Sequence, residues 1–270
     1  MCAAGAGVKN QGAKFDVCIF CQADGVLTDE HAIPFGLGGR IVLKKATCEN
    51  CRVETGRVEQ RLLRGLWRPY RHYLGLSSRS RDFPDLYPVK VLFASGLVAE
   101  AFVPADQYPL TIFYDFHKAA ILEDRIDDST PAAPEIYMKQ IRPLVDWVWL
   151  DGERRNLRHP DKIEFPTQFP VADFCRVLAK IAHCLAIHRR GINAFSEFYL
   201  PKFITGSADG LLTYVGSCSN ELIKPRLPGT SIHGFLDRRV GDHLVVNLQL
   251  FRETGDLPPI YEIVVGRLKD

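Results

Sequence analysis

The sequence lacks the features of membrane-spanning, secreted and repetitive proteins. No uninterrupted apolar run approaches the length of about 18 residues that a membrane helix needs, and the N-terminal segment lacks the apolar core of an export signal. Internal repeats and low-complexity tracts are also missing. Because 46% of the 270 residues are hydrophobic and 24% are charged, we expect a folded cytoplasmic protein without membrane contacts.

The chain has little net charge, since 34 basic residues are nearly balanced by 32 acidic ones. A net charge of +2 by itself indicates no class of partner. The charges are unevenly placed, however. Residues 40–81 contain 11 lysines and arginines but only three glutamates, so their net charge is +8. The rest of the chain therefore has a net charge of −6. This asymmetry favours a polyanionic partner such as nucleic acid.

Four of the eight cysteines form two C-x-x-C pairs, Cys18 with Cys21 and Cys48 with Cys51. Without an export signal the thiols are expected to stay reduced, so close pairs indicate metal binding rather than disulfides. Four thiolates complete the tetrahedral ligand set of a structural Zn²⁺ ion. The alternative is a redox pair, but a single pair suffices for that role and the thioredoxin-like βαβ context is absent.

The segment between the cysteine pairs is longer than in an ordinary zinc ribbon, with 26 residues where about 15–20 are usual. It begins with a strand-like stretch and continues through Asp29, Glu30, His31 and a proline. A glycine-rich turn at 36–39 and a second strand-like stretch follow, and the second cysteine pair then opens a helix. The expected local order is strand, strand, helix.

These motifs resemble the HNH endonuclease family, specifically members whose ββα-metal core is bracketed by two C-x-x-C pairs. The resemblance rests on CIFC, EHAIP, the GLGG turn and CENC, and covers residues 17–76. It implies a metal-dependent endonuclease that hydrolyses nucleic-acid phosphodiester bonds, with DNA favoured over RNA. It also implies that Glu30 binds a catalytic Mg²⁺ or Mn²⁺ ion, with Asp29 as a substitute, while the four cysteines hold structural zinc only.

The chemistry of phosphodiester cleavage agrees with these roles. A neutral imidazole with a pKa of about 6.5 can take a proton from water, so His31 is the candidate general base. A hard divalent cation stabilises charge on the phosphate and prefers carboxylate and water ligands, which suits Glu30 beside His31.

Two positions depart from the family pattern, because Leu43 and Arg52 stand where many members have asparagine or histidine. Arginine cannot bind a divalent ion, since its guanidinium is always protonated and only donates hydrogen bonds. Glu59 is the candidate replacement ligand, about two helical turns beyond Arg52 on nearly the same face. The alternative is a catalytically decayed module that still binds nucleic acid, in which His31 is structural.

Arginines recur after the second cysteine pair at the spacing of one helix face, and Pro69 is expected to kink or end that helix. The nucleic-acid-binding residues predicted from this stripe and from the preceding strand are Lys44, Lys45, Arg52, Arg57, Arg61, Arg64, Arg68 and Arg71. A solvated surface and a face for an acidic partner protein are the alternatives.

Beyond a connector near residue 85, the sequence predicts secondary structure but no function. Strands are expected at 89–96, 97–103 and 108–116, a helix at 171–190, and a strand pair flanking the turn at 254–259. The cysteines and histidines of that helix point in different directions and are not expected to bind metal. Trp147 and Trp149 are expected on one strand face, in a core or an interface.

The predicted fold class is α+β. A flexible N-terminus, residues 1–16, precedes a zinc-stapled ββα-metal, HNH-like module with a basic helix at 17–85. A larger mixed α/β domain with antiparallel strands, residues 86–270, follows without an assigned role. The sequence leaves open whether the chain forms a homodimer.

Overall fold

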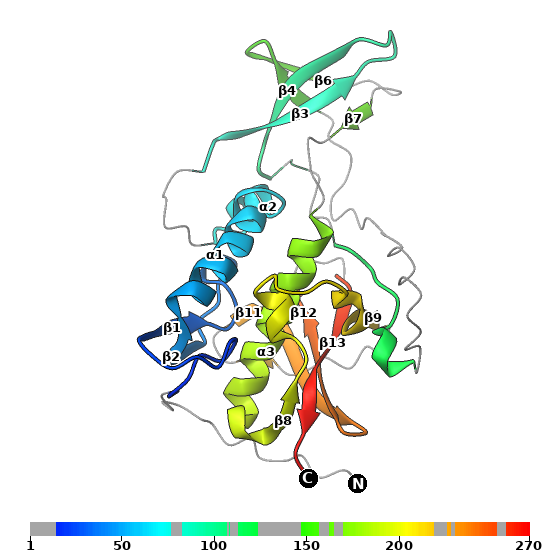
Figure 1. Ribbon diagram of the computed structural model, residues 1–270. Helices are drawn as coiled ribbons and strands as arrows, with labels where there is room; N and C mark the ends of the chain where they lie inside the picture. The colour runs from blue at the N-terminus through cyan, green and yellow to red at the C-terminus, as the bar shows by residue number, and fades with distance from the viewer. Residues whose placement is uncertain are drawn as a thin grey trace.

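The computed structural model describes residues 15–76, 83–106, 108, 113–123, 147–156, 162–164, 170–218, 226–227, 230–252 and 258–270. Within these ranges the protein is a mixed α/β structure with four α-helices and antiparallel sheets (Figure 1). Most of the predicted flexible N-terminus, residues 1–14, lies outside them. No helix in the described part of the chain is long and apolar enough to cross a membrane.

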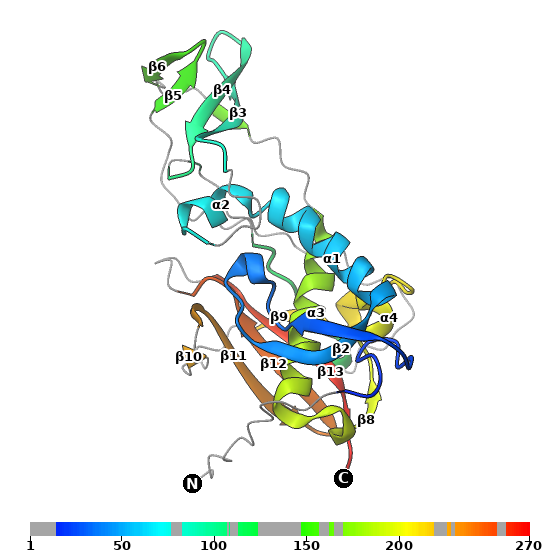
Figure 2. The ribbon, with the colours of Figure 1, turned by 90° about the vertical axis from the view of Figure 1, so that its left-hand side faces the viewer.

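The segment between the cysteine pairs forms an antiparallel hairpin that leads directly into a helix (Figure 2). Strand β1 (Leu27–His31) pairs with β2 (Val42–Cys48), and helix α1 (Glu49–Arg64) begins at the next residue. The hairpin connection is tight at Gly39, where an added Cβ would lie 1.9 Å from the Ile33 carbonyl oxygen. Only glycine fits there. The local order is therefore strand, strand, helix.

The basic helix is interrupted, as the sequence predicted from Pro69. Helix α1 ends at Arg64, and helix α2 (Arg68–Tyr73) starts after a short turn with Pro69 in its first turn. Proline lacks an N–H and clashes with the carbonyl one turn earlier, so it is tolerated at a helix start but not in a helix interior. The arginine stripe expected on one helix face is consequently divided between α1 and α2.

Helix α3 (Val171–Arg190) has the predicted bounds and ends at Gly191, whose φ of 79° suits glycine. One side of α3 packs against α1, and another packs against strands β12 (His243–Gln249) and β13 (Ile260–Leu268) (Figure 1, Figure 2). The two strands pair antiparallel, as expected for the sequences that flank the 254–259 turn.

The sheet against α3 has the strand order β10-β11-β12-β13-β8, and β9 also pairs with β13. Its remaining strands are β8 (Phe195–Phe198), β9 (Val215–Cys218), β10 (Arg226–Leu227) and β11 (Thr230–Val240). The other short helices are α4 (Pro201–Ile204), η1 (Phe35–Leu37), η2 (Ala120–Leu122), η3 (Ile192–Ala194) and η4 (Leu211–Thr213). All described pairings in this sheet are antiparallel.

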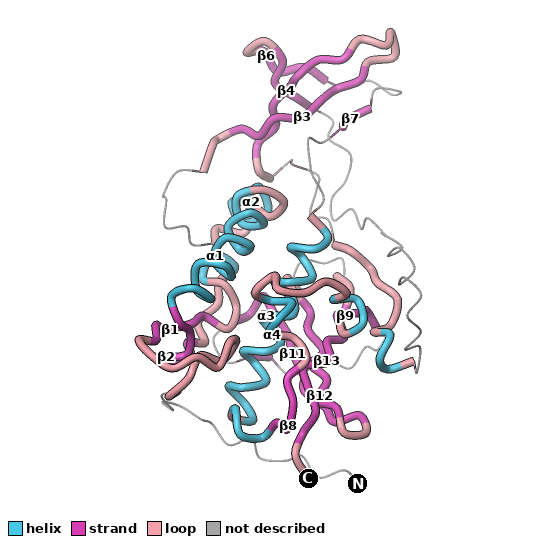
Figure 3. Tube along the Cα trace, viewed as in Figure 1, coloured by secondary structure: helices cyan, strands magenta, loops and turns pink. Residues whose placement is uncertain are grey.

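A smaller antiparallel sheet lies at one end of the molecule, at the top of Figure 3. Its order is β6-β5-β4-β3-β7. Its strands are β3 (Leu86–Leu92), β4 (Val98–Pro104), β5 (Trp147–Leu150), β6 (Glu153–Asn156) and β7 (Lys162–Glu164). A separate hydrophobic cluster that includes Val89, Val103 and Val148 fills one face. The first two strands predicted after the connector are thus confirmed.

The third of these predicted strands is wrong where the structure describes it, because residues 113–116 are irregular. Phe113, Tyr114 and Phe116 are buried in the main core instead. The Tyr114 ring packs edge-on to Phe174 in α3, with centroids 4.9 Å apart. This aromatic segment therefore packs in the core without forming a strand. Periodicity alone does not distinguish a buried strand from a buried irregular segment.

One hydrophobic core joins the N-terminal module to helix α3 and the C-terminal sheet. Trp67, for example, contacts Phe174 and Phe251, with ring centroids 5.6 and 6.1 Å away. Two buried histidines connect the same parts. His183 donates to the Ile19 carbonyl at 2.9 Å, and His233 donates to the Leu37 carbonyl at 2.7 Å. The parts on either side of the predicted boundary at residue 85 therefore share a core.

Candidate functional site

The four paired cysteines lie together. Their sulfur atoms are all within 4.8 Å of one another, and Cys21 Sγ lies 3.6 Å from Cys48 Sγ. Zn–S bonds of about 2.3 Å in a tetrahedron place the sulfurs about 3.8 Å apart, so the spacing fits a Cys₄ ion site. The soft sulfur ligands suit zinc rather than magnesium. Within the described ranges, this is the one cluster of side chains that could hold a metal ion.

The hairpin backbone brings the two cysteine pairs together. The Cys18 N–H donates to the Ala23 carbonyl at 3.0 Å, which closes the turn around the first pair. The Ile19 N–H donates to the Ala46 carbonyl in β2 at 2.9 Å, which attaches that turn to the hairpin. The second pair lies where β2 ends and α1 begins.

The cysteine cluster needs a cation to become fully ionised. Burial and the neighbouring Cys18 sulfur both raise the pKa of Cys51 well above its usual value. Four thiolates at these distances repel one another, and a bound cation offsets that repulsion because it favours the deprotonated ligands.

A cavity of about 320 Å³ opens between β1 and α1. It is lined by residues that the sequence singled out for catalysis, metal binding or nucleic-acid binding. From β1 these are Asp29, Glu30 and His31, and from the helices they are Arg52, Glu59, Arg64 and Arg71. The cavity therefore gathers residues from separate motifs, because the hairpin folds back onto the helix that follows it.

A shift in the β1–β2 register decides which acidic residue points inward. The register shifts between Thr28 and Glu30, which leaves Asp29 exposed and buries Glu30 to 6% exposure. Asp29 pairs with Lys44 at 2.7 Å and accepts the Lys45 N–H at 3.1 Å. These contacts lower the pKa of Asp29 and keep it on the surface. Glu30, rather than Asp29, is therefore the inner carboxylate.

His31 ends β1 on the wall of the cavity, where it is partly exposed. Its ring lies edge-on to Phe35, with centroids 5.8 Å apart. Phe35 belongs to η1 and also lines the cavity, so one side of the imidazole faces an aromatic ring. This position allows His31 to meet a ligand in the cavity.

A lysine that the sequence analysis missed contacts both inner carboxylates. Lys180 Nζ lies 2.6 Å from Glu30 Oε1 and 2.9 Å from Glu59 Oε1, and it also donates to the His31 carbonyl oxygen. The Lys180 side chain is 1% exposed. The other oxygen of Glu30, Oε2, accepts the Thr47 hydroxyl at 3.1 Å. Glu30 and Glu59 thus meet around an ammonium group.

The ammonium of Lys180 stays charged despite its burial. Burial alone would lower the pKa of Lys180, but the Glu30 and Glu59 carboxylates outweigh that effect and raise the pKa above its usual value. Lys180 belongs to α3, where it interrupts an apolar stretch. A lone lysine within that apolar stretch could have indicated a buried ion pair from the sequence, since buried lysines are almost always paired.

Glu30 and Glu59 do not fit a Mg²⁺ or Mn²⁺ ion in this arrangement, because the ammonium of Lys180 holds the place between them. Leu43 and Arg52, the two positions that depart from the family pattern, supply no other metal ligand. Leu43 is buried in the core, and the Arg52 guanidinium donates to Glu49 at 2.7 Å. A divalent ion would have to displace Lys180 to bind both carboxylates.

The predicted nucleic-acid-binding residues lie in different environments. Arg57 pairs with Glu54 at 2.8 Å, and Arg61 pairs with Asp173 of α3 at 2.5 Å. Arg64 and Lys45 are exposed, and Arg68 is half-buried. The Arg57–Glu54 pair is exposed, and such pairs contribute only about 0–1 kcal/mol, so a ligand can replace Glu54 at little cost.

Arg71 is an exception to the expected surface stripe. It is 5% exposed, and its guanidinium donates to the Gly36 carbonyl at 2.5 Å and to the Leu63 carbonyl at 2.8 Å. Since α2 is a separate helix, Arg71 turns inward and attaches the glycine-rich turn to α1. Its role is mainly to hold the wall of the cavity.

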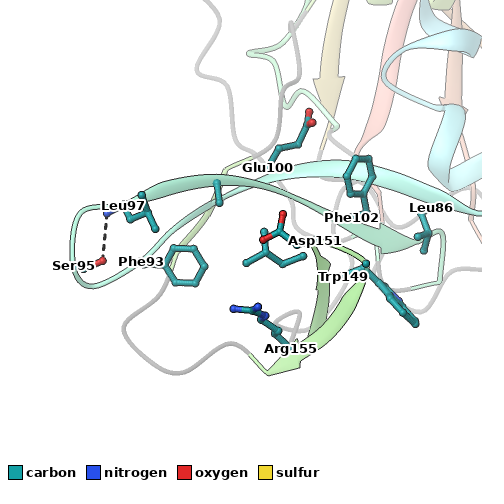
Figure 4. Close-up of a pocket in the computed structure, with 12 residues that line it drawn as sticks. Leu86, Phe93, Ser95, Leu97, Glu100, Phe102, Trp149, Asp151 and Arg155 are labelled. Atoms are coloured by element: carbon teal, nitrogen blue, oxygen red, sulfur yellow. Dashed lines mark hydrogen bonds between the residues drawn. The ribbon is translucent and has the colours of Figure 1, made fainter.

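A second, larger cavity of about 790 Å³ lies on the small sheet, lined by Phe93, Leu97 and Arg155 among others (Figure 4). None of the site residues expected from the sequence line it. Trp147 and Trp149 are 39% and 38% exposed on one face of β5, so they do not belong to a core. Arg154 covers the Trp147 ring at 4.8 Å.

Comparison of the chain with models of known protein families, with characterised proteins and with solved structures finds no match. The function must therefore be argued from the cavity and the cysteine cluster themselves.

Proposed function

We propose that the protein is an HNH-type endonuclease that hydrolyses nucleic-acid phosphodiester bonds in the cavity between β1 and α1. One observation carries the proposal: His31, Glu30, Glu59 and several arginines, each singled out from the sequence, line the same open cavity. The Cys₄ cluster supports it, because it joins the first turn and the end of β2 to α1, the helix that supplies one wall of the cavity.

In this proposal His31 takes a proton from the attacking water, and the water oxygen bonds to phosphorus. The P–O bond to the leaving sugar oxygen breaks, and that oxygen takes a proton from solvent. The place of His31 on the cavity wall is open to a ligand, and imidazole is suited to proton transfer near neutral pH. The arginines of α1 hold the phosphate, since a guanidinium binds two phosphate oxygens at once. Arg64 is exposed at the cavity, and Arg52 can exchange its exposed Glu49 partner for a phosphate.

The test is a cleavage assay with zinc-loaded protein on supercoiled plasmid, single-stranded DNA and RNA. We expect wild-type protein to cut at least one substrate, with duplex DNA favoured. His31→Ala should bind that substrate but fail to cut it. His188→Ala is the matched control, because His188 lies on α3 and does not line the cavity. Equal cutting by wild type and His31→Ala contradicts the proposal.

A second candidate is nucleic-acid binding without hydrolysis. The observation that favours it is the ammonium of Lys180 between Glu30 and Glu59, the two residues expected from the sequence to bind the catalytic metal ion. Salt-sensitive binding by the wild type, with intact substrate in every condition, would establish this function instead.

A further inference from the structure

We propose that Lys180 is the resident cation between Glu30 and Glu59, in the place where a divalent metal ion was expected, so that the site works without Mg²⁺ or Mn²⁺. The consequence for cleavage rests on the proposed function. The identity of the cation between Glu30 and Glu59 does not depend on the proposed function, so it can be measured separately.

The ammonium of Lys180 is surrounded by two carboxylate oxygens and one carbonyl oxygen. An ammonium has three N–H donors. Three acceptors converge on Nζ, which are Glu30 Oε1, Glu59 Oε1 and the His31 carbonyl oxygen. Each comes from a different position around the site, in β1 or in α1. A fully buried ammonium that contacts two carboxylates and a carbonyl oxygen is a built-in component of the site.

The charges point to the same conclusion. Glu30 and Glu59 carry two negative charges into a largely buried position, with side chains 8% and 18% exposed. Such carboxylates need a compensating cation. Lys180 supplies it from within the chain. A divalent ion bound to the same oxygens would lie against the ammonium, and the repulsion between the two cations excludes it.

Lys180 is a positioning residue rather than a catalytic one. It is 1% exposed and does not line the cavity, so it does not reach a ligand there. Through its bond to the His31 carbonyl it fixes the end of β1, and through Glu59 it fixes that end against α1. The positive charge that meets a phosphate comes from Arg52 and Arg64 instead.

The first test is Mn²⁺ binding, followed by electron paramagnetic resonance of the free ion. The protein is zinc-loaded, freed of other divalent ions on a chelating resin, and checked for zinc content. We expect no Mn²⁺ site in the wild type. Lys180→Met, which removes the charge at similar length, should gain one Mn²⁺ site that the wild type lacks.

Two further variants define the gained site. Lys180→Met combined with Glu59→Gln should lose it, and Lys118→Met, at an exposed position, should not create one. A folded Lys180→Met variant that binds no Mn²⁺ would contradict the inference. Binding of one Mn²⁺ by the wild type, reduced in Glu59→Gln, overturns the inference. This comparison does not need Lys180→Met to fold.

The second test measures cleavage by the zinc-loaded wild type with and without added Mg²⁺. The same rate in both conditions supports the inference. Cleavage that appears only with Mg²⁺ overturns it and leaves the proposed function standing. If neither condition gives cleavage, the hydrolytic function fails, and the Mn²⁺ titration still decides whether Lys180 is the resident cation.

Discussion

Lys180 in α3 and Glu30 in β1 form an ion pair of 2.6 Å in the interior, where their side chains are 1% and 8% exposed. The pair links the β1–β2 hairpin to a helix far along the chain. Helix α3, which carries no recognisable motif, therefore completes the site around Glu30 and Glu59. We expect the hairpin, α1 and α3 to act as one unit.

Removal of the Lys180 charge should strongly destabilise the fold. Lys180→Met leaves Glu30 and Glu59 buried without a cation, and breaking a buried pair costs about 3–5 kcal/mol. Urea unfolding at neutral pH measures this loss. Lys118→Met should change stability by less than about 0.5 kcal/mol because its side chain is exposed. A similar small change for both variants would show that the buried ion pair contributes little.

Loss of one cysteine ligand should release zinc and disorder the hairpin. Cys48→Ser removes a ligand at the junction of β2 and α1, so elemental analysis should find no zinc and circular dichroism should report lost structure. Cys218→Ser, outside the cluster, should retain the metal. Zinc bound equally by both variants would refute the Cys₄ assignment.

Stability should fall in mild acid because His233 is buried in its neutral form. Burial lowers its pKa from 6.5 to about 4, while Nε2 donates to Leu37 and Nδ1 accepts the Phe251 N–H. The unfolded chain therefore binds a proton below pH 6.5 that the folded chain refuses until about pH 4. In that window this group costs about 1.4 kcal/mol per pH unit, and above it the cost disappears.

His233→Gln provides the measurement of this effect. The slope of its unfolding free energy against pH should be smaller than that of the wild type by the amount that one bound proton contributes. His117→Gln is the control, because His117 is exposed. An unchanged pH dependence in His233→Gln would mean that another group accounts for acid sensitivity.

Charge reversal at Arg64 should weaken nucleic-acid binding for all sequences alike. Arg64 is exposed at the cavity, so Arg64→Glu should remove about one phosphate contact. The slope of the logarithm of the binding constant against the logarithm of salt concentration should then become smaller by about one. Arg61 is a poorer test, because its reversal would also oppose Asp173. Arg239→Glu, on β11, should leave binding unchanged, and an equal loss in both variants would indicate nonspecific electrostatics.

Features set by local spacing could be predicted from the sequence. The two C-x-x-C pairs, the break before Pro69 and the bounds of α3 depend on residues close to one another along the chain. The cavity was also foreseeable in part. Glu30, His31 and Glu59 lie within one strand–strand–helix segment, and the helix periodicity places Glu59 near the strand.

Features set by tertiary packing could not be predicted. The contact between Lys180 and Glu30 depends on where α3 docks, which no local pattern reports. Arg71 satisfies every criterion for a surface arginine, but α2 turns it toward the backbone of the glycine-rich turn. The aromatic run at 113–116 is equally compatible with a strand and with an irregular segment in a core.

The most direct test of the account is the single-turnover cleavage rate of zinc-loaded wild-type protein and His31→Ala on supercoiled plasmid, at matched binding and stability. Loss of a general base should lower the rate by about 100- to 10,000-fold. We expect a fall in that range, without a change in plasmid affinity. An unaltered rate in His31→Ala would contradict the assignment of the cavity as the site of hydrolysis.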